Sequence, residues 1–553
     1  MRNSLYSVTL DEALTTVGGH GRYQIHLLII ISGIWMSQAL FMMNLPYLLS
    51  DPNPNANCID QDCCEEGFQF PEDSVTNAAN EWKLFCGKEY KTTLISLAYF
   101  IGLGIGTYII SYLANRFGRK IMTITGLILT SVTLFICAAS PSAEFFMAFS
   151  LVSGVFVGGT TMTSFIYVHE IVDGEYRNVF AGIIFAAWGF GMMLMSLINW
   201  IITQWRIHMI IIGTANILWV PFLFKFYESP RFLASNQGKY SKARYVINCI
   251  AQYNQKQPFT EMLEGEKVIG YQETNPRAIA SESTSTSSKY SFVPISNGIV
   301  SVTESESKVV KRYSCIDLIK LNSLRKVFIV MSFLWFILSF SYYGVVFSIP
   351  HYIGNQQLNG TIMALAETLS CLSMAFVLNK IGRQLGFVIN FGTAGVCCLM
   401  ALAFINSSSS NSLIKSANHV IQLILLSLAR FTIASVRLIS YIYAVECFPT
   451  SVRSLVFGVL GLMSLLGSIC CPLIIMLGGI IKIHPLFFIG LLLITGSFFS
   501  CLLVETLGKN MEDYVEEEKE EMRNPEPSVS IELPSNATSQ STKRKFEKLK
   551  EEN

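Results

Sequence analysis

The stretch Ala114-Asn-Arg-Phe-Gly-Arg-Lys120 is a short basic turn between two long apolar runs, 92–113 and 121–139. Each run has about the 20 residues that an α-helix needs to cross the hydrocarbon core of a bilayer. Lysine and arginine gather in the cytoplasmic loops of membrane proteins. The stretch therefore predicts a membrane hairpin whose loop lies in the cytoplasm.

A degenerate copy of this turn occurs later in the chain as Leu378-Asn-Lys-Ile-Gly-Arg-Gln384, again between two apolar runs. A second signature repeats with it, because Glu170 precedes Arg177 and Glu446 precedes Arg453 at the same spacing. Two signatures that recur in the same order indicate a duplicated membrane unit. Duplicated halves around a central site are a design of secondary transporters.

The composition of the chain also indicates a membrane protein. Of the 553 residues, 51% are hydrophobic and only 14% are charged, and the mean hydropathy is +0.44. Soluble domains have about 25% charged residues, so most of this surface is expected to face lipid. The formal net charge of +1 gives no reason to expect a nucleic-acid partner.

The sequence contains no motif that points to an enzyme or an ATP-driven pump. It has no Gly-x-x-x-x-Gly-Lys-Ser/Thr loop, and its seven histidines form no cluster with the spacing of metal ligands. We therefore expect no catalytic residue, no metal and no cofactor. The first apolar run begins near Ile25, too late and too long for a signal peptide, and without a convincing cleavage site.

Twelve apolar runs are predicted to cross the membrane. The first six are 23–49, 92–113, 121–139, 145–168, 179–200 and 207–226. The last six are 327–350, 357–379, 385–405, 420–445, 455–477 and 484–504. The sequence thus predicts an all-α polytopic membrane protein with twelve transmembrane helices in two pseudo-symmetric halves.

Polar segments between these runs set the predicted domain limits. Residues 1–24 are expected to form a cytoplasmic amino-terminal segment, and 25–227 the first half. The stretch 228–326 is polar, and its Ser-rich middle has too few apolar residues to fold alone, so it is expected to be a cytoplasmic linker. The second half covers 327–504, and a charged cytoplasmic tail covers 505–553.

The loop at 50–90 carries nine acidic residues and two lysines, a composition expected outside the cell. Four of its residues are cysteines, for which we expect up to two disulfides of open pairing, with free thiols as the alternative. They are Cys58, Cys63, Cys64 and Cys86. Asn359 and Asn406 begin sequons in predicted exterior loops and are candidate glycosylation sites.

Further motifs lie at the ends of the predicted spans. They are Leu10-Asp-Glu-Ala-Leu14, Glu81-Trp-Lys-Leu-Phe-Cys86, Glu228-Ser-Pro-Arg-Phe-Leu233, Glu446-Cys-Phe-Pro-Thr-Ser-Val-Arg453 and Glu505-Thr-Leu-Gly-Lys509. In this order, and with the two basic turns, they resemble the major facilitator superfamily, and in particular its organic cation/anion transporter branch. The resemblance implies the major facilitator fold and transport of small organic ions.

The chain departs from the family pattern at informative positions. Asn115 stands where the family's loop usually has Asp, and Ser150 where an Arg is expected in span four. In span eleven, cation carriers of the branch have an Asp and many anion carriers an Arg, but this chain has Leu465. Because Leu465 is uncharged, the position that would best reveal the sign of the substrate's charge gives no information here.

Charged residues within the spans are candidate substrate-binding groups, because each costs roughly 3 kcal/mol to insert at a helix centre. Glu367 could pair with a cation or a proton, with an internal salt bridge as the alternative. Arg437 could bind a carboxylate or sulfate through its fork of donors, or be neutralised by Glu367. Arg430 lies on the same helix face as Arg437 and matches a common family Arg, which favours a structural bond.

Trp335 and Tyr342 complete the predicted substrate-binding site. They are seven residues apart in span seven, lie on one helix face, and match cavity positions of the family. Flat aromatic walls suit organic ions through stacking and cation–π contact. The alternative is packing in the core or against lipid.

A cytoplasmic gate is predicted at the helix ends that carry the repeated signatures. Ion pairs of Glu170 and Glu446 with the two basic turns would hold one access state. The predicted gate residues are Asn115, Arg116, Gly118, Arg119, Glu170, Arg177, Lys380, Arg383, Glu446 and Arg453.

The predicted function is secondary transport of a small organic cation, anion or zwitterion by alternating access. The chain would be a multi-pass protein of the plasma membrane. Its partners would be the solute, the lipid bilayer, and a coupling ion or the membrane potential. Two alternatives are a sugar-porter-like facilitator of neutral solutes and a nutrient sensor that does not transport.

Overall fold

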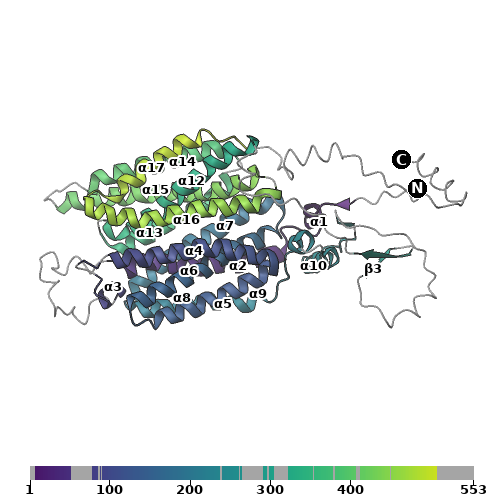
Figure 1. Ribbon diagram of the computed structural model, residues 1–553. Coiled ribbons are helices and arrows are strands. Elements are labelled where there is room, and N and C mark those ends of the chain that lie inside the picture. The colour runs from purple at the N-terminus through teal and green to yellow at the C-terminus, as the bar shows by residue number, and fades with distance from the viewer. Residues whose placement is uncertain are drawn as a thin grey trace, which may run out of the picture.

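The structure is a computed structural model. It describes residues 7–50, 77–84, 87–88, 90–236, 239–260, 262–263, 290–295, 298–303, 322–352, 354–377, 380–405, 412–448 and 450–506. Its long helices run side by side in a bundle, with the amino-terminal helices in one layer and the carboxy-terminal helices in the other (Figure 1).

The first half consists of six spans at the predicted positions. They are α2 (Arg22–Leu48), α4 (Tyr90–Phe117), α5 (Arg119–Ala138), α6 (Ala143–His169), α7 (Arg177–Ile201) and α8 (Trp205–Ile217), which α9 (Val220–Leu223) continues. The second half repeats the arrangement. Its helices are α12 (Asn322–Phe347), α13 (Gln356–Val377), α14 (Arg383–Ile405), α15 (Ser412–Cys447), α16 (Thr450–Ile481) and α17 (Pro485–Ser500).

Ten of the helices in the described ranges are long and apolar enough to cross a membrane. The two remaining helices of the bundle differ for identifiable reasons. α13 carries Glu367 and begins with two glutamines, and α17 is only 16 residues long. With these two, the bundle has the twelve helices that the sequence predicts.

The two halves meet along two pairs of helices. α4 packs along α16, and α7 packs along α13. Glycines permit both approaches. A Cβ on Gly104 would lie 2.2 Å from Leu465 Cδ2, and one on Gly189 would lie 2.7 Å from Thr368 Oγ1.

Two short helices, α1 (Leu10–Thr16) and α10 (Tyr240–Tyr253), lie beyond the end of the bundle predicted to be cytoplasmic (Figure 1). α1 begins with a capping box in which Thr9 and Glu12 bond each other's backbone N–H groups. After α10, Asn254 Nδ2 donates to the carbonyls of Val17 and Gly18 at 3.1 and 3.0 Å. This contact ties the amino-terminal segment to the predicted linker.

The remaining described elements are short. They are β1 (Ser7–Val8), α3 (Ala78–Glu81), η2 (Gly174–Tyr176), η3 (Phe232–Asn236), β2 (Met262–Leu263), β3 (Tyr290–Ile295), β4 (Gly298–Thr303) and η4 (Ile349–His351). β1 pairs in parallel with β2, and β3 pairs with β4 as an antiparallel hairpin. α10 and both strand pairs involve residues of the stretch 228–326, so this stretch has described structure beyond a plain linker.

Candidate functional site

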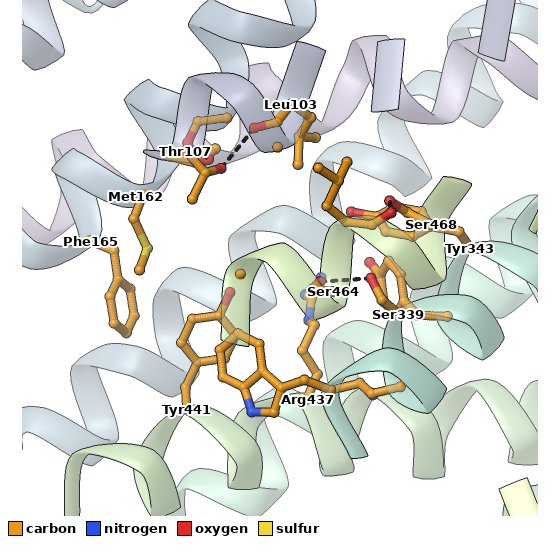
Figure 2. Close-up of a pocket in the computed structure, with 18 of the residues that line it drawn as sticks. Leu103, Thr107, Met162, Phe165, Ser339, Tyr343, Arg437, Tyr441, Ser464 and Ser468 are labelled. Atoms are coloured by element: carbon orange, nitrogen blue, oxygen red, sulfur yellow. Dashed lines mark hydrogen bonds between the residues drawn. The ribbon is translucent and has the colours of Figure 1, made fainter. Parts of the chain in front are cut away.

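A cavity of about 120 Å³ lies between the two halves. Figure 2 shows side chains from both halves facing it, among them Thr107 and Met162 of the first half and Ser339, Arg437 and Tyr441 of the second. Both of the predicted aromatic residues, Trp335 and Tyr342, line it as well. Three of the four predicted substrate-binding residues thus line one cavity, and the fourth, Glu367, does not.

Glu367 is fully buried in α13 and accepts three side-chain hydrogen bonds. Its Oε1 accepts from the Tyr342 hydroxyl at 2.7 Å and from Arg437 Nη2 at 2.9 Å, and its Oε2 accepts from Arg430 Nη2. Arg430 also donates from Nη1 to the Tyr342 carbonyl at 2.7 Å. We call Glu367, Arg430, Arg437 and Tyr342 the buried ion cluster.

The buried ion cluster carries a net positive charge. Arginine stays protonated in proteins, so two guanidinium groups face one carboxylate and one positive charge is left over. Arg430 and Glu367 have side chains that are 1% and 0% exposed, whereas Arg437 is 12% exposed. Among the described residues that line the cavity, Arg437 alone is charged. The excess charge is thus presented to the cavity by Arg437.

Two N–H donors at the cavity are buried without a hydrogen-bond partner. They are Nε of Arg437 and Nε1 of Trp335, and both residues line the cavity. A buried donor without an acceptor costs about 1–3 kcal/mol, more for a charged group. Both atoms have almost no accessible surface in the structure, so a side chain must move before a ligand oxygen can reach them.

Aromatic rings surround the Arg437 guanidinium. Its Cζ lies 4.5 Å from the ring centre of Tyr342, 4.7 Å from that of Phe185 and 5.9 Å from that of Trp188. The rings of Trp335 and Tyr441 lie 4.8 Å apart. The cavity therefore combines one cation with flat apolar walls.

Four of the predicted gate residues form two equivalent ion pairs, one in each half, at the end of the bundle predicted to be cytoplasmic. In the first half, Glu170 Oε1 lies 3.1 Å from Arg119 Nη2. In the second, Glu446 Oε1 lies 2.8 Å from Arg383 Nη2. Burial raises the pKa of Glu170, and the Arg119 guanidinium acts in the opposite direction. Each ion pair joins helices of the same half.

Two further carboxylates adjoin these ion pairs at the starts of α5 and α14. Glu228 Oε1 accepts from the Arg119 backbone N–H at 2.9 Å, and Glu505 Oε1 accepts from that of Arg383 at 2.8 Å. Gly118 has φ +116°, and a Cβ there would lie 2.4 Å from Glu228 Oε2. A glycine is therefore required before α5 for both its conformation and its space.

Four other predicted gate residues, whose side chains the structure describes, lie outside these ion pairs. Asn115, Arg116 and Lys380 are exposed. Arg177 pairs with Asp11 of α1 at 2.6 Å. Arg453 lies in the first turn of α16.

The modification sites are placed only in part. Asn359 is 1% exposed within α13, and its Oδ1 lies 3.3 Å from His419 Nε2, so its amide has no access for a sugar. Asn406 lies outside the described residues. The same holds for the four cysteines predicted to form disulfides, namely Cys58, Cys63, Cys64 and Cys86.

Sequence reasoning missed several residues that build the cavity. Trp188 and Phe185 of α7 line it, and so does the hydroxyl pair of Ser339 and Ser464, whose Oγ atoms are 2.8 Å apart. Each lies in a uniformly apolar run, so nothing in the local pattern distinguishes it from a lipid-facing residue.

The arrangement of two six-helix halves around one cavity agrees with a match to a family model. The model described as Major Facilitator Superfamily matches residues 27–469. The chain belongs to the major facilitator superfamily. The predicted fold and a multi-pass membrane protein are thereby confirmed.

Relatives within the superfamily place the chain further. It is 24% identical to solute carrier family 22 member 21 of Mus musculus, over 83% of this chain and 74% of the relative. It is 23% identical to organic cation/carnitine transporter 2 of Homo sapiens, over 83% of this chain and 75% of the relative. It is 25% identical to solute carrier family 22 member 6 of Rattus norvegicus, over 82% of this chain and 74% of the relative. The predicted organic cation/anion transporter branch is confirmed by these relatives.

Solved structures of the superfamily share the fold. The proton:xylose symporter XylE bound to 6-bromo-6-deoxy-D-glucose is 16% identical, with a TM-score of 0.57, covering 89% of this chain and 98% of that one. A partially occluded inward-open conformation of XylE from E. coli is 15% identical, also with a TM-score of 0.57. The match covers 88% of this chain and 100% of that one. Family and relatives are transporters.

Proposed function

We propose that this protein is a secondary transporter of small organic ions in the plasma membrane, and that its preferred substrate is an organic anion. Alternating access of the two halves to the central cavity would carry the solute across. The observation that supports an anion is the position of Arg437, the one charged side chain among the described residues that line the cavity.

Electrostatics favours an anion over a cation in this cavity. The buried ion cluster has one positive charge in excess, and an isolated charge in a poorly solvated site is unfavourable unless it is paired. An anion at Arg437 would neutralise this charge. A cation would add a second positive charge, whose repulsion is strong where the effective dielectric constant is low.

The donors and walls of the cavity favour a carboxylate or sulfonate attached to an organic body. Arg437 Nε and Trp335 Nε1 are unpaired N–H donors beside the cavity, and a movement of the side chains would turn them toward anionic oxygens. Phe185, Trp188 and Tyr441 offer ring faces to an apolar body. Sites of this kind hold a ligand by apolar contact and fix its orientation with a few polar groups.

Glu367 acts in this proposal as the counterion that holds Arg437, because all three of its hydrogen-bonding neighbours are donors of the protein itself. Its carboxylate is fully buried, and it is not among the residues that line the cavity. A cation would have to displace Arg437 to reach it. This placement favours the internal salt bridge over direct binding of a cation.

The alternatives from other classes have less support. A facilitator of neutral sugars would leave the excess charge of Arg437 without a partner. A nutrient sensor that binds without transport is compatible with the same cavity, so binding alone does not decide between sensor and carrier. Uptake does.

The test is uptake of matched solutes into proteoliposomes that hold the purified protein. Benzenesulfonate, benzyltrimethylammonium and phenylalanine share a benzene ring and differ in charge, and glucose represents neutral solutes. We expect saturable uptake of benzenesulfonate and little of benzyltrimethylammonium. Preferred uptake of the cation or of glucose would overturn the anion proposal. Saturable binding without any uptake would identify a sensor.

A further inference from the structure

The indole of Trp188 links the buried ion cluster to the first half of the protein, and Met192 and Phe185 of the same helix also contact the cluster. Trp188 Nε1 of α7 donates a hydrogen bond of 2.9 Å to the Tyr342 hydroxyl of α12. That hydroxyl in turn donates to Glu367 Oε1 at 2.7 Å. A chain of two hydrogen bonds therefore runs from the first half to the carboxylate that holds Arg437.

The contact lies in a tightly packed part of the interface between the halves. Trp188 and Tyr342 are 5% and 2% exposed. Next to Trp188, a Cβ on Gly189 would lie 3.1 Å from the Thr368 backbone nitrogen, so α7 closely approaches α13. Met192, one turn further along α7, lies with its Sδ 3.6 Å from the Tyr342 hydroxyl. Both side chains also line the cavity, so this hydrogen bond lies at the boundary between the packed interface and the cavity.

Both hydrogen bonds, Trp188 to Tyr342 and Tyr342 to Glu367, are expected to change when an anion binds Arg437. Glu367 Oε1 accepts from both Arg437 and the Tyr342 hydroxyl. An anion at Arg437 would share the positive charge that now neutralises this carboxylate. The carboxylate would then accept a stronger bond from Tyr342, and the polarised hydroxyl would accept a stronger bond from Trp188, because hydrogen bonds in a chain reinforce one another.

We propose that Trp188 is a positioning residue that couples occupancy of Arg437 to closure of the two halves. The inference rests on the proposed binding of an anion at Arg437. Binding strengthens the contact between Trp188 and Tyr342, so the loaded carrier favours the occluded arrangement in which α7 and α12 are held together. A carrier without this bond still binds the anion but closes less readily around it.

The substitution Trp188→Phe tests the coupling, because it removes the N–H group and keeps an aromatic ring. Trp205→Phe is the matched control. Its buried indole Nε1 donates to Glu81 Oε2 at 2.7 Å, but both residues belong to the first half and neither lines the cavity. The readouts are the Kd of benzenesulfonate in detergent and its maximal rate of uptake in proteoliposomes.

We expect Trp188→Phe to lower the maximal uptake rate by about tenfold, which corresponds to the loss of roughly one hydrogen bond in the transition state, while Kd changes less than about threefold. Trp205→Phe should lower the rate by less than about threefold. Equal effects of the two substitutions on the maximal rate, or a loss confined to Kd, would overturn the coupling.

A double substitution separates this coupling from a general loss of packing. Tyr342→Phe removes the acceptor of the Trp188 bond, so adding Trp188→Phe to it should change the maximal rate less than about twofold. Multiplication of the two single effects would overturn the proposal. Absence of both binding and uptake of benzenesulfonate in the unmodified protein would instead reject the proposed anion function, and the coupling with it.

Discussion

Arg437 and Glu367 form an ion pair of 2.9 Å in which the carboxylate is fully buried and the guanidinium faces the central cavity. Arg430 binds the other carboxylate oxygen from within the core. One carboxylate therefore serves two guanidinium groups. We propose that this unbalanced charge gives the cavity a preference for an anion.

Arg437→Gln should abolish most of this preference. Hydrogen bonds to charged groups contribute about 1.5–3 kcal/mol, which corresponds to a rise of about ten- to a hundredfold in the KM for benzenesulfonate. Uptake into proteoliposomes measures the change. Arg437→Lys is the control, because it keeps the charge and loses the fork of donors. Unchanged kinetics in Arg437→Gln would remove this residue from the site.

Glu367→Gln should destabilise the protein strongly. The substitution leaves two buried guanidinium groups without a carboxylate, and breaking a buried ion pair costs about 3–5 kcal/mol. Thermal unfolding in detergent measures the loss. Glu144→Gln is the matched control, because Glu144 pairs with Lys91 at the surface, and we expect little change there. Equal melting temperatures for the two variants would show that Glu367 is not needed to neutralise the cluster.

Gly106→Ala should prevent normal packing of α4 against α6. A Cβ at Gly106 would lie 1.8 Å from the Val155 carbonyl oxygen, and backbone atoms cannot yield as a side chain can. We expect loss of folded protein, measured by size-exclusion chromatography in detergent. Gly458→Ala in α16 is the control, since its Cβ would meet nothing within 4 Å. A folded Gly106→Ala carrier with full yield would contradict the packing described.

Asn254→Ala should loosen the amino-terminal segment from α10. The Asn254 amide donates to the Val17 and Gly18 carbonyls, and its Oδ1 accepts from the Tyr23 N–H at 2.9 Å. Loss of these bonds is expected to destabilise the segment by about 1–3 kcal/mol. Limited proteolysis at the amino terminus should accelerate. The control is Gln252→Ala, an exposed position on the same helix. Identical digestion rates of both variants would show that the Asn254 hydrogen bonds do not hold the amino-terminal segment.

The fold could be predicted from the sequence because its signals are strong and repeated. Long apolar runs determine helices that must satisfy their backbone groups within the bilayer. The basic turn at Arg116–Lys120 and its copy near Arg383 indicate the duplication and predict the orientation. The structure adds the reason for the glycine at position 118, where a Cβ would meet the Glu228 carboxylate.

Two kinds of site residue could be predicted: charges that interrupt an apolar run, and Trp335 and Tyr342, which match cavity positions of the family. Glu367, Arg430 and Arg437 are conspicuous for the first reason, and the structure brings all three together. Which of them faces the cavity depends on helix rotation, which the sequence of one helix does not determine. Trp188 could not be found in this way, because tryptophan in a membrane span is also common without any function.

The most direct test of the central claim is equilibrium binding to the purified carrier. Benzenesulfonate and benzyltrimethylammonium share a ring of the same size and carry opposite charges, so a comparison of the two isolates the effect of charge. The account predicts saturable binding of benzenesulfonate, its loss in Arg437→Gln, and no saturable binding of benzyltrimethylammonium. Tighter binding of the cation, or equal binding of both ions, would contradict it.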